Sequence, residues 1–326
     1  METIKAIDYS PENETLHITS GNFTGIVHGV DNYSFKEIEK YFQNTLIGSV
    51  IWQKERTLLD LDQIRKTNHL TPKSLGLVDI SLWDLLGKIQ KLPVYQLLGG
   101  FRDRIPAYSE SDVNATSKMM SEDLETAQET GLIGHQFTFK TTKQISKEFS
   151  NVPKPTSTSL LLLATGRRSL NLGDALLIAR DLESYGFHWF ECPLASNDPS
   201  ALLKLNTSVS IPIVEGDFAT SSAPLAMKSL VDRVVDRLRF EIPTMGGITE
   251  AIKWARGSES LGMNCEISWT TPVGPNPAVH VLGAIRNGEL ISWRPNDSNL
   301  EISEGCIIIP SLPGLCFEIG KKAKFS

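Results

Sequence analysis

The sequence predicts an α/β protein in which a smaller α+β domain precedes a barrel of parallel strands. Three observations predict this fold class. The chain has 326 residues, too long for one small module. From Ile105 onward, strand patterns recur every ~20–30 residues with helical patterns between them. Eight such strands close most naturally into a (β/α)₈ barrel. An open doubly wound sheet is the alternative, disfavoured because no G-x-G-x-x-G motif follows a strand.

Residues 1–103 predict the α+β domain. Period-two alternation around Ile4, in 16–19 and in 24–27 predicts a small antiparallel sheet. Ser34 and Glu37 have the spacing of a capping box, which predicts that a helix begins there. Further helices are predicted over 52–65, after residue 72 and from residue 93 to residue 99. Strands followed by a helical cluster are typical of an α+β unit.

Residues 104–304 predict the barrel, and 305–326 a strand–turn–strand segment returning to the first domain. Barrel strands are predicted over 105–108, 136–141, 160–164, 189–192, 211–215, 237–242, 264–268 and 290–293. Helices are predicted over 117–129, 172–185, 199–206, 224–230, 248–261 and 277–286. Residues 149–158 contain two prolines and predict an irregular stretch where a barrel helix is due.

The composition excludes several function classes. Hydrophobic residues make up 40% of the chain, enough for a substantial core. The formal net charge of −6 argues against nucleic acid or an anionic membrane as a partner. No long apolar run or signal peptide is seen, and the four cysteines show no C-x-x-C spacing. We therefore expect a soluble cytoplasmic protein with reduced cysteines.

Two carboxylates stand where predicted strands run into loops. Glu191 ends the strand near 189–192, and Asp217 follows the strand near 211–215. The preceding strand has Leu163 where a third acid would complete a metal site. Two carboxylates can hold Mg²⁺ weakly, with water and substrate oxygens completing the shell. Without a cation they repel, and one takes a proton or finds a basic partner. Solvated loop-edge acids are the alternative.

Five stretches carry a resemblance to a known family. They are residues 78–88, 92–108, 189–194 (W-F-E-C-P-L), 246–250 (G-G-I-T-E) and 312–315 (L-P-G-L). In this order and spacing the chain resembles the enolase superfamily, and within it the mandelate racemase/muconate lactonizing enzyme group. The resemblance implies a modified TIM barrel, (β/α)₇β, with an α+β N-terminal capping domain. It also implies that one Mg²⁺ stabilises an enolate formed by abstracting a proton next to a carboxylate.

The resemblance implies a metal site made by carboxylates on strands three, four and five. Carried onto this sequence, Glu191 and Asp217 occupy the fourth- and fifth-strand positions, and Leu163 replaces the first ligand. The arginines Arg167 and Arg168 follow Leu163 closely. A guanidinium there could stand in electrostatically for the metal, the alternative being a solvated pair.

The acid/base positions are also changed. On strand two, residues 139 and 141 fall where the family has lysines. Lys140 is the only lysine there, and alternation turns it away from the interior unless the register shifts by one residue. The base position on strand six is Glu241. Ser268 replaces the strand-seven histidine, and Ser292 an acid on strand eight.

Two functions from different classes remain open at this point. In the first, the chain is a divergent acid-sugar dehydratase or isomerase. Glu191 and Asp217 would hold a weak Mg²⁺, and Glu241 or Lys140 would act as the base. In the second, it is a catalytically inactive pseudoenzyme that binds a small carboxylate or serves as an oligomer subunit. A homo-oligomer is expected in either case.

Overall fold

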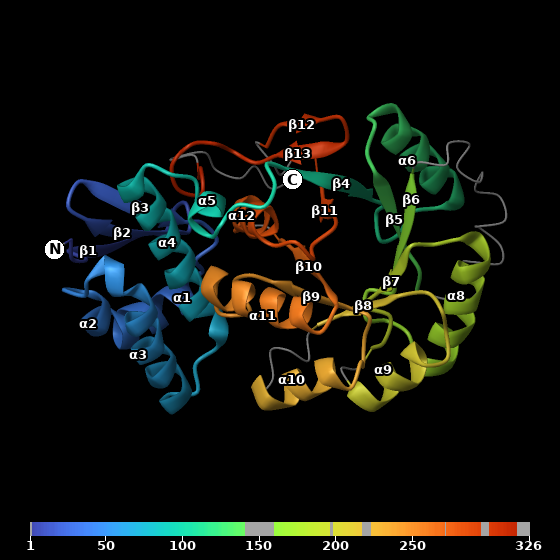
Figure 1. Ribbon diagram of the computed structural model, residues 1–326, viewed down its shortest axis with the longest axis horizontal. Coiled ribbons are helices and arrows are strands. Elements are labelled where there is room, and N and C mark those ends of the chain that lie inside the picture. Colours follow the sequence, from blue (N-terminus) through green and yellow to red (C-terminus); the bar gives the residue numbers. More distant parts are fainter. Residues whose placement is uncertain are drawn as a thin grey trace.

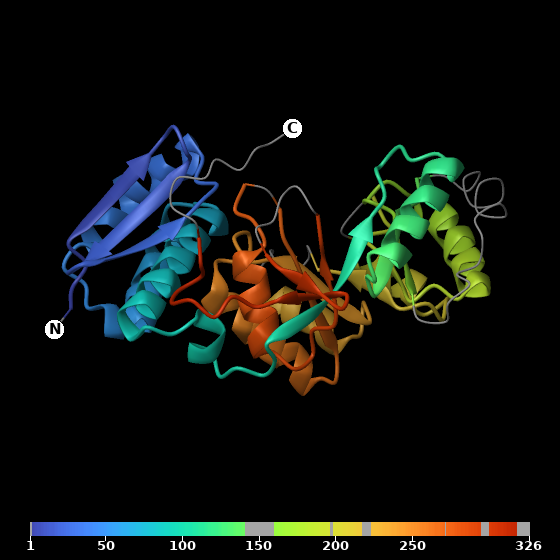
Figure 2. The ribbon, with the colours of Figure 1, turned by 90° about the horizontal axis from the view of Figure 1, so that it is seen from above.

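A computed structural model describes residues 2–140, 160–195, 198–216, 223–270, 272–294 and 300–317. The N-terminal elements lie at one end of the molecule, beside helices α11 (Ile248–Ser260) and α12 (Asn276–Ala284) (Figures 1 and 2). None of the described helices is long and apolar enough to cross a membrane. The boundaries drawn between the predicted domains stay a prediction.

The N-terminal part contains the predicted antiparallel sheet and helical cluster. The sheet has strands β1 (Ala6–Ser10), β2 (Thr15–Ser20) and β3 (Phe23–Val27) in the order β1-β2-β3. The helices are α1 (Asn32–Glu37), a π-helical stretch (Ile38–Phe42), α2 (Gln43–Leu46), a 3₁₀ turn (Ile51–Gln53), α3 (Lys54–Thr67), α4 (Pro72–Gln90) and α5 (Val94–Leu97).

The expected capping box at Ser34 is wrong. Helix α1 is capped three residues earlier, because the Asp31 carboxylate accepts a hydrogen bond from the Ser34 backbone N–H at 2.7 Å. The carboxylate of Glu37, the other residue of the expected box, instead accepts a hydrogen bond from the Ser74 hydroxyl on α4. Asp31 is as good a helix cap as serine.

The predicted parallel barrel is confirmed. Its strands are β4 (Arg104–Glu110), β5 (Gly134–Thr138), β6 (Leu161–Thr165), β7 (Trp189–Glu191), β8 (Ile213–Glu215), β9 (Arg237–Glu241), β10 (Asn264–Ser268) and β11 (Ile291–Ser292). Each of β4 to β9 pairs with the next, and β11 pairs with β4. The Cys265 N–H donates to Asn287 O at 2.8 Å, and Trp269 Nε1–H donates to Ser292 O at 2.8 Å. These bonds bring the last two strands together, so the open-sheet alternative is not seen.

The described barrel helices follow the predicted pattern closely. They are α6 (Ser117–Glu129), α8 (Leu172–Tyr185), α9 (Pro199–Asn206), α10 (Ala223–Val231), α11 and α12. The irregular stretch expected at 149–158 lies outside the described residues. The closing segment adds β12 (Ile302–Ser303) and β13 (Cys306–Ile308), which pairs antiparallel with β4. Beyond it, the Leu315 N–H donates to the carboxylate of Asp84 on α4 at 2.7 Å.

Helix α4 is attached to the barrel through buried Asp79. Its carboxylate accepts hydrogen bonds from the Thr249 N–H at 2.8 Å and the Thr249 hydroxyl at 2.7 Å, at the start of α11. Lys54 Nζ, which is also buried, lies 3.3 Å from the same carboxylate. Gly247 permits this approach, since a Cβ there would lie 2.4 Å from the Asp79 carboxylate and its φ is +105°. The G-G-I-T-E motif is thus a docking point for α4.

The interior of the barrel holds a small apolar cluster. Its members are Tyr108, Leu163, Trp189, Val214 and Leu290, one from each of five strands or their edges. The Tyr108 and Trp189 rings meet edge to face, with centroids 6.1 Å apart. Because β4 and β7 are separated by two strands, this contact spans the barrel. The cluster therefore forms the floor under the open end of the barrel.

Buried His135 on β5 predicts a loss of stability in acid. Its ring nitrogens hydrogen-bond the hydroxyls of Ser109 at 2.7 Å and Ser111 at 2.8 Å. Burial lowers the pKa of His135 to about 4, against a smaller opposing effect of Glu110. The unfolded chain takes up this proton near pH 6.5. The folded state therefore loses about 2–3 kcal/mol relative to the unfolded state as pH falls from 7 to 4.5.

Urea unfolding of the wild type and of His135→Gln at pH 7 and pH 4.5 checks this expectation. The variant should lose less stability over this interval than the wild type does. His280, whose pKa burial lowers to about 3, stays in both proteins and cancels in the comparison. An equal loss in the two proteins would show that His135 does not contribute.

Candidate active site

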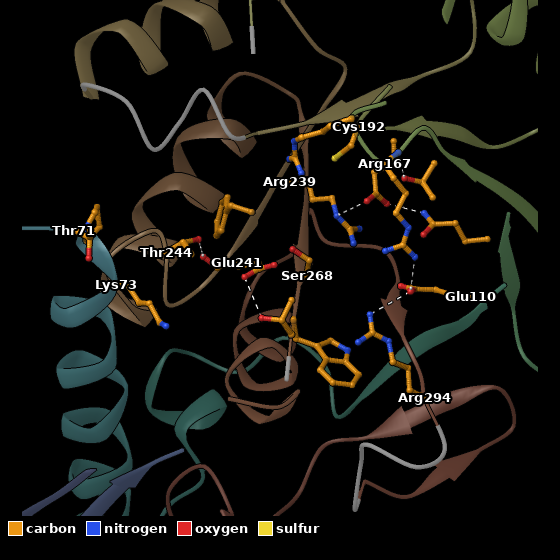
Figure 3. Close-up of a pocket in the computed structure, with 18 residues that line it drawn as sticks. Thr71, Lys73, Glu110, Arg167, Cys192, Arg239, Glu241, Thr244, Ser268 and Arg294 are labelled. Carbon is orange, nitrogen blue, oxygen red and sulfur yellow. Dashed lines mark hydrogen bonds and ion pairs between the residues drawn. The ribbon is translucent and has the colours of Figure 1, made fainter. Parts of the chain in front are cut away.

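A cavity of about 700 Å³ opens at the carboxyl ends of the barrel strands. Residues from most barrel strands line it, and Thr71, Pro72 and Lys73 at the start of α4 contribute from the N-terminal part (Figure 3). Its charged lining consists of Arg167, Arg168, Arg239, Arg294, Lys73, Glu110, Glu191 and Glu241. This position is where barrel enzymes place their active sites.

Glu191 ends β7 with both carboxylate oxygens engaged. Oε2 accepts a hydrogen bond from Gln136 Nε2 at 2.7 Å. Oε1 lies 3.1 Å from Arg239 Nε in an ion pair. Burial raises the pKa of the Glu191 carboxyl, and the Arg239 guanidinium and the Gln136 hydrogen bond oppose that shift. Glu191 is therefore held by two protein donors.

Arg239 is one of the site residues that the sequence did not predict, together with Glu110, Gln136 and Arg294. It lies in the middle of β9, with its side chain only 12% exposed, and its Nη1–H donates to the Tyr108 hydroxyl at 3.4 Å. Burial acts to lower the pKa of Arg239, but Glu191, Tyr108 and Cys192 together outweigh it and hold that pKa well above its usual value. The guanidinium stays charged. A signal was present: alternation along β9 puts Arg239 on the same face as Glu241.

Arg167 and Arg168 line the same cavity but contact other acids. Arg168 Nη2 lies 2.8 Å from Glu215 Oε1, and Arg167 Nη2 lies 3.4 Å from Glu110 Oε2. Both arginines have left-handed backbone, with φ of +46° and +55°. The Arg168 N–H donates to the Cys192 carbonyl at 2.7 Å, which fixes this turn against the end of β7. Strained backbone of this kind is often found at functional sites.

Glu110 stands between two guanidiniums. Its Oε2 is 3.4 Å from Arg167 Nη2 and 3.2 Å from Arg294 Nη2. The Arg294 guanidinium carbon lies 4.6 Å from the centroid of the Trp269 ring. Figure 3 shows Arg167, Glu110 and Arg294 in one row along the side of the cavity next to Arg239. This side is basic.

The expected metal position is only partly populated by oxygen donors. Leu163 is fully buried in the apolar floor and adds no oxygen. Asp217 lies outside the described residues. Within the described part of the chain, no three His, Cys, Asp or Glu side chains are grouped so as to hold a metal ion. Mg²⁺ takes six oxygen ligands, usually one or two carboxylates with several waters, and of the three expected ligand positions the described residues supply a carboxylate at Glu191 alone.

The register expected for the second barrel strand is wrong. Gln136, not Phe139, faces the cavity from β5. Phe139 packs on the opposite face, with its ring centroid 6.0 Å from that of Phe187. Alternation from Gln136 assigns Lys140 to the interior side, but it follows the end of β5 and does not line the cavity. Residue 141, the second expected lysine position, lies outside the described residues.

Glu241 and Ser268 line the cavity as expected. Glu241 Oε2 accepts a hydrogen bond from the Thr270 hydroxyl at 3.3 Å, and no described lysine or arginine forms an ion pair with it. In Figure 3, Glu241 and Ser268 lie together, across from the row of Arg167, Glu110 and Arg294. Ser292 is buried in β11 and is absent from the described lining. The cavity thus has an acidic side and a basic side.

Comparison with known proteins agrees with this architecture. One relative is the L-Ala-D/L-Glu epimerase of Clostridium acetobutylicum, which is 25% identical over 81% of this chain and 74% of its own length. Another is a D-galactonate dehydratase family member of Musicola paradisiaca, which is 27% identical over 82% of this chain and 76% of its own length. The solved structure of Agrobacterium tumefaciens D-glucarate dehydratase complexed with magnesium superimposes with a TM-score of 0.82, at 24% identity over 96% of this chain and 93% of that one.

A second solved structure, L-talarate dehydratase from Polaromonas complexed with Mg and L-glucarate, has a TM-score of 0.83 at 20% identity, over 95% of this chain and 87% of that one. Likeness at these identities shows the fold. The family domains themselves match in sequence. Residues 17–99 match the mandelate racemase/muconate lactonizing enzyme N-terminal domain, and residues 158–323 match the enolase C-terminal domain-like family. The chain therefore belongs to the mandelate racemase/muconate lactonizing enzyme group of the enolase superfamily.

Proposed function

We propose that this protein binds a small organic acid in the barrel cavity without the magnesium-assisted chemistry that its family resemblance implies. The ion pair between Arg239 and Glu191 carries the proposal. It joins a fixed positive charge to Glu191, which stands at the fourth-strand ligand position. Glu191 then acts as a structural partner of a cation and not as a free metal ligand.

The electrostatics disfavour a divalent cation next to Glu191. A metal ion bound to Glu191 would lie close to the Arg239 guanidinium, in a site with little solvent to screen the repulsion. Leu163 supplies no third carboxylate to offset it. When bound, Mg²⁺ would supply charge stabilisation for an enolate. In this chain, Glu191 and Asp217 would be the two carboxylates that hold the ion.

A small acid fits the other properties of the cavity. Its volume of about 700 Å³ is in the range of sites for small ligands. Arg167, Arg239 and Arg294 offer planar donors suited to a carboxylate. Relatives named for galactonate and an acidic dipeptide, and a structural neighbour holding L-glucarate, support an acid as the ligand class.

A second candidate is a divergent acid-sugar dehydratase or isomerase, favoured by Glu241. This carboxylate faces the cavity without a described cationic partner, as a general base requires. No described base is hydrogen-bonded to the hydroxyl of Ser268 beside it, and Lys140 does not line the cavity. A single base would act on one face of the substrate, which suits dehydration better than racemisation.

Titration calorimetry separates the two candidates. The wild type is titrated with Mg²⁺ and Mn²⁺, and in EDTA with D-galactonate and D-glucarate. We expect an acid to bind in EDTA, no saturable metal binding below about millimolar concentration, and no dehydration of either acid. Micromolar Mg²⁺ binding that disappears in Asp217→Asn, together with metal-dependent turnover, would overturn the proposal in favour of the dehydratase.

A further inference from the structure

We infer that Arg239 anchors the carboxylate of the ligand, in the part of the cavity where a family metal would act, and that Glu191 positions Arg239. The ligand class is a hydroxy acid with a single carboxylate. This inference rests on the proposed binding of a small acid and adds the residue that recognises it.

The first argument is the direction of the guanidinium. Arg239 Nε is bound to Glu191 and Nη1 to the Tyr108 hydroxyl. Among the described residues, no acceptor is bound to Nη2. The side chain lines the cavity, so its unused N–H bonds are available to a ligand there (Figure 3). A guanidinium held on one edge by a carboxylate can bind a second carboxylate in bidentate form on another edge.

The second argument is the balance of charge on the basic side. Three cations, Arg167, Arg239 and Arg294, face two anions, Glu110 and Glu191. One positive charge remains, which one ligand carboxylate would neutralise. Arg168 is left out of this count because it pairs with Glu215. Arg167 and Arg294 share the single carboxylate of Glu110 at the partly exposed mouth of the cavity, so this excess of positive charge favours an anionic ligand.

The third argument is the opposite side of the cavity. Glu241, Ser268 and Thr270 present a carboxylate and two hydroxyls there. These groups suit the hydroxyls of a ligand. Glu241 would repel a second carboxylate, since no described cation is paired with it. The cavity therefore favours an aldonic acid such as D-galactonate over an aldaric acid such as D-glucarate.

Calorimetry with D-galactonate in EDTA tests the assignment on matched variants. Arg239→Gln should weaken binding about tenfold or more, because a charge-assisted bidentate bond is lost. Glu191→Gln, which keeps an acceptor for Arg239 Nε but removes the negative charge next to it, should bind more tightly than the wild type. Arg104→Gln, a control at the exposed start of β4, should bind like the wild type.

The double variant Glu191→Gln/Arg239→Gln controls for misfolding of Arg239→Gln, because it removes both charges of the ion pair and leaves neither unpaired. It should fold, as circular dichroism and thermal melting would report, and should bind as weakly as Arg239→Gln. If the wild type binds D-galactonate and the double variant binds it equally well, the inference fails and the proposed function stands. If neither acid binds the wild type, the proposed function fails with it. Tighter binding of D-glucarate than of D-galactonate would overturn the single-carboxylate preference.

Discussion

Asp79→Ala is expected to lower the free energy of unfolding by about 3–5 kcal/mol, as is typical when one partner of a buried ion pair is removed. Asp79 is fully buried between α4 and the start of α11. Its removal leaves the Thr249 N–H without an acceptor and Lys54 without its buried counter-charge. Among the described residues, Lys54 Nζ would keep the Thr249 hydroxyl at 2.7 Å, the Trp83 ring at 4.2 Å and the exposed Glu55 at 3.6 Å.

Urea unfolding at pH 7, followed by tryptophan fluorescence, measures this effect. Asp62→Ala is the matched control, since Asp62 pairs with Arg65 and Lys66 on the surface of α3 and should cost less than about 1 kcal/mol. Asp79→Asn should lie between the two, because it keeps the volume and one acceptor. A change for Asp79→Ala as small as for Asp62→Ala would show that this contact does not stabilise the joint between α4 and the barrel.

Much of the fold could be predicted because its local signals agree with its tertiary structure. Helices α6 and α8 have the predicted bounds, and the side chains of Thr116 and Asn171 cap their first turns. Gly186 ends α8 in left-handed conformation, at φ +76°, as sequence rules expect. Apolar periodicity, cap and terminator point to the same residues in these helices.

The register of β5 could not be predicted, because this strand is buried on both faces. All five of its residues are inaccessible to solvent. Polarity therefore does not distinguish the side of Gln136 from the side of Phe137, and a shift by one residue exchanges the faces. The contact of Gln136 with Glu191 settles the question, and it joins residues from strands two apart in the sheet.

Glu191 and Glu241 were found from sequence, but Glu110 and the cation paired with Glu191 were not. Strand-end position singles out Glu191 and Glu241, since each ends its strand. Arg239 lies two residues before the end of β9, where a strand interior usually carries apolar side chains. Its role depends on Glu191, which lies two strands away in the barrel. Period-two alternation gives the face of a side chain but not its partner across the barrel.

Leu163→Asp is expected to cost about 5 kcal/mol of stability at neutral pH, from the lost apolar side chain and from burial of a carboxylate. Leu163 is fully buried against Trp189 and the other residues of the barrel floor. Arg239, the nearby cation of the site, is already paired with Glu191. Restoring the family's carboxylate at position 163 therefore does not by itself restore a metal site.

The loss of stability caused by Leu163→Asp should increase with pH. Burial raises the pKa of the introduced carboxyl above the value near 4 of the unfolded chain. The free energy of unfolding of Leu163→Asp therefore falls as the pH rises from that value toward the raised pKa, and it is regained in acid. Leu163→Asn, equal in size but without charge, should lose about 2–4 kcal/mol with no such pH dependence. The two unfolding curves at pH 5 and pH 8 give the charge contribution by difference. If instead Leu163→Asp is as stable as Leu163→Asn and binds Mg²⁺ in the micromolar range, then Leu163 alone excludes the metal and the pairing of Arg239 with Glu191 does not.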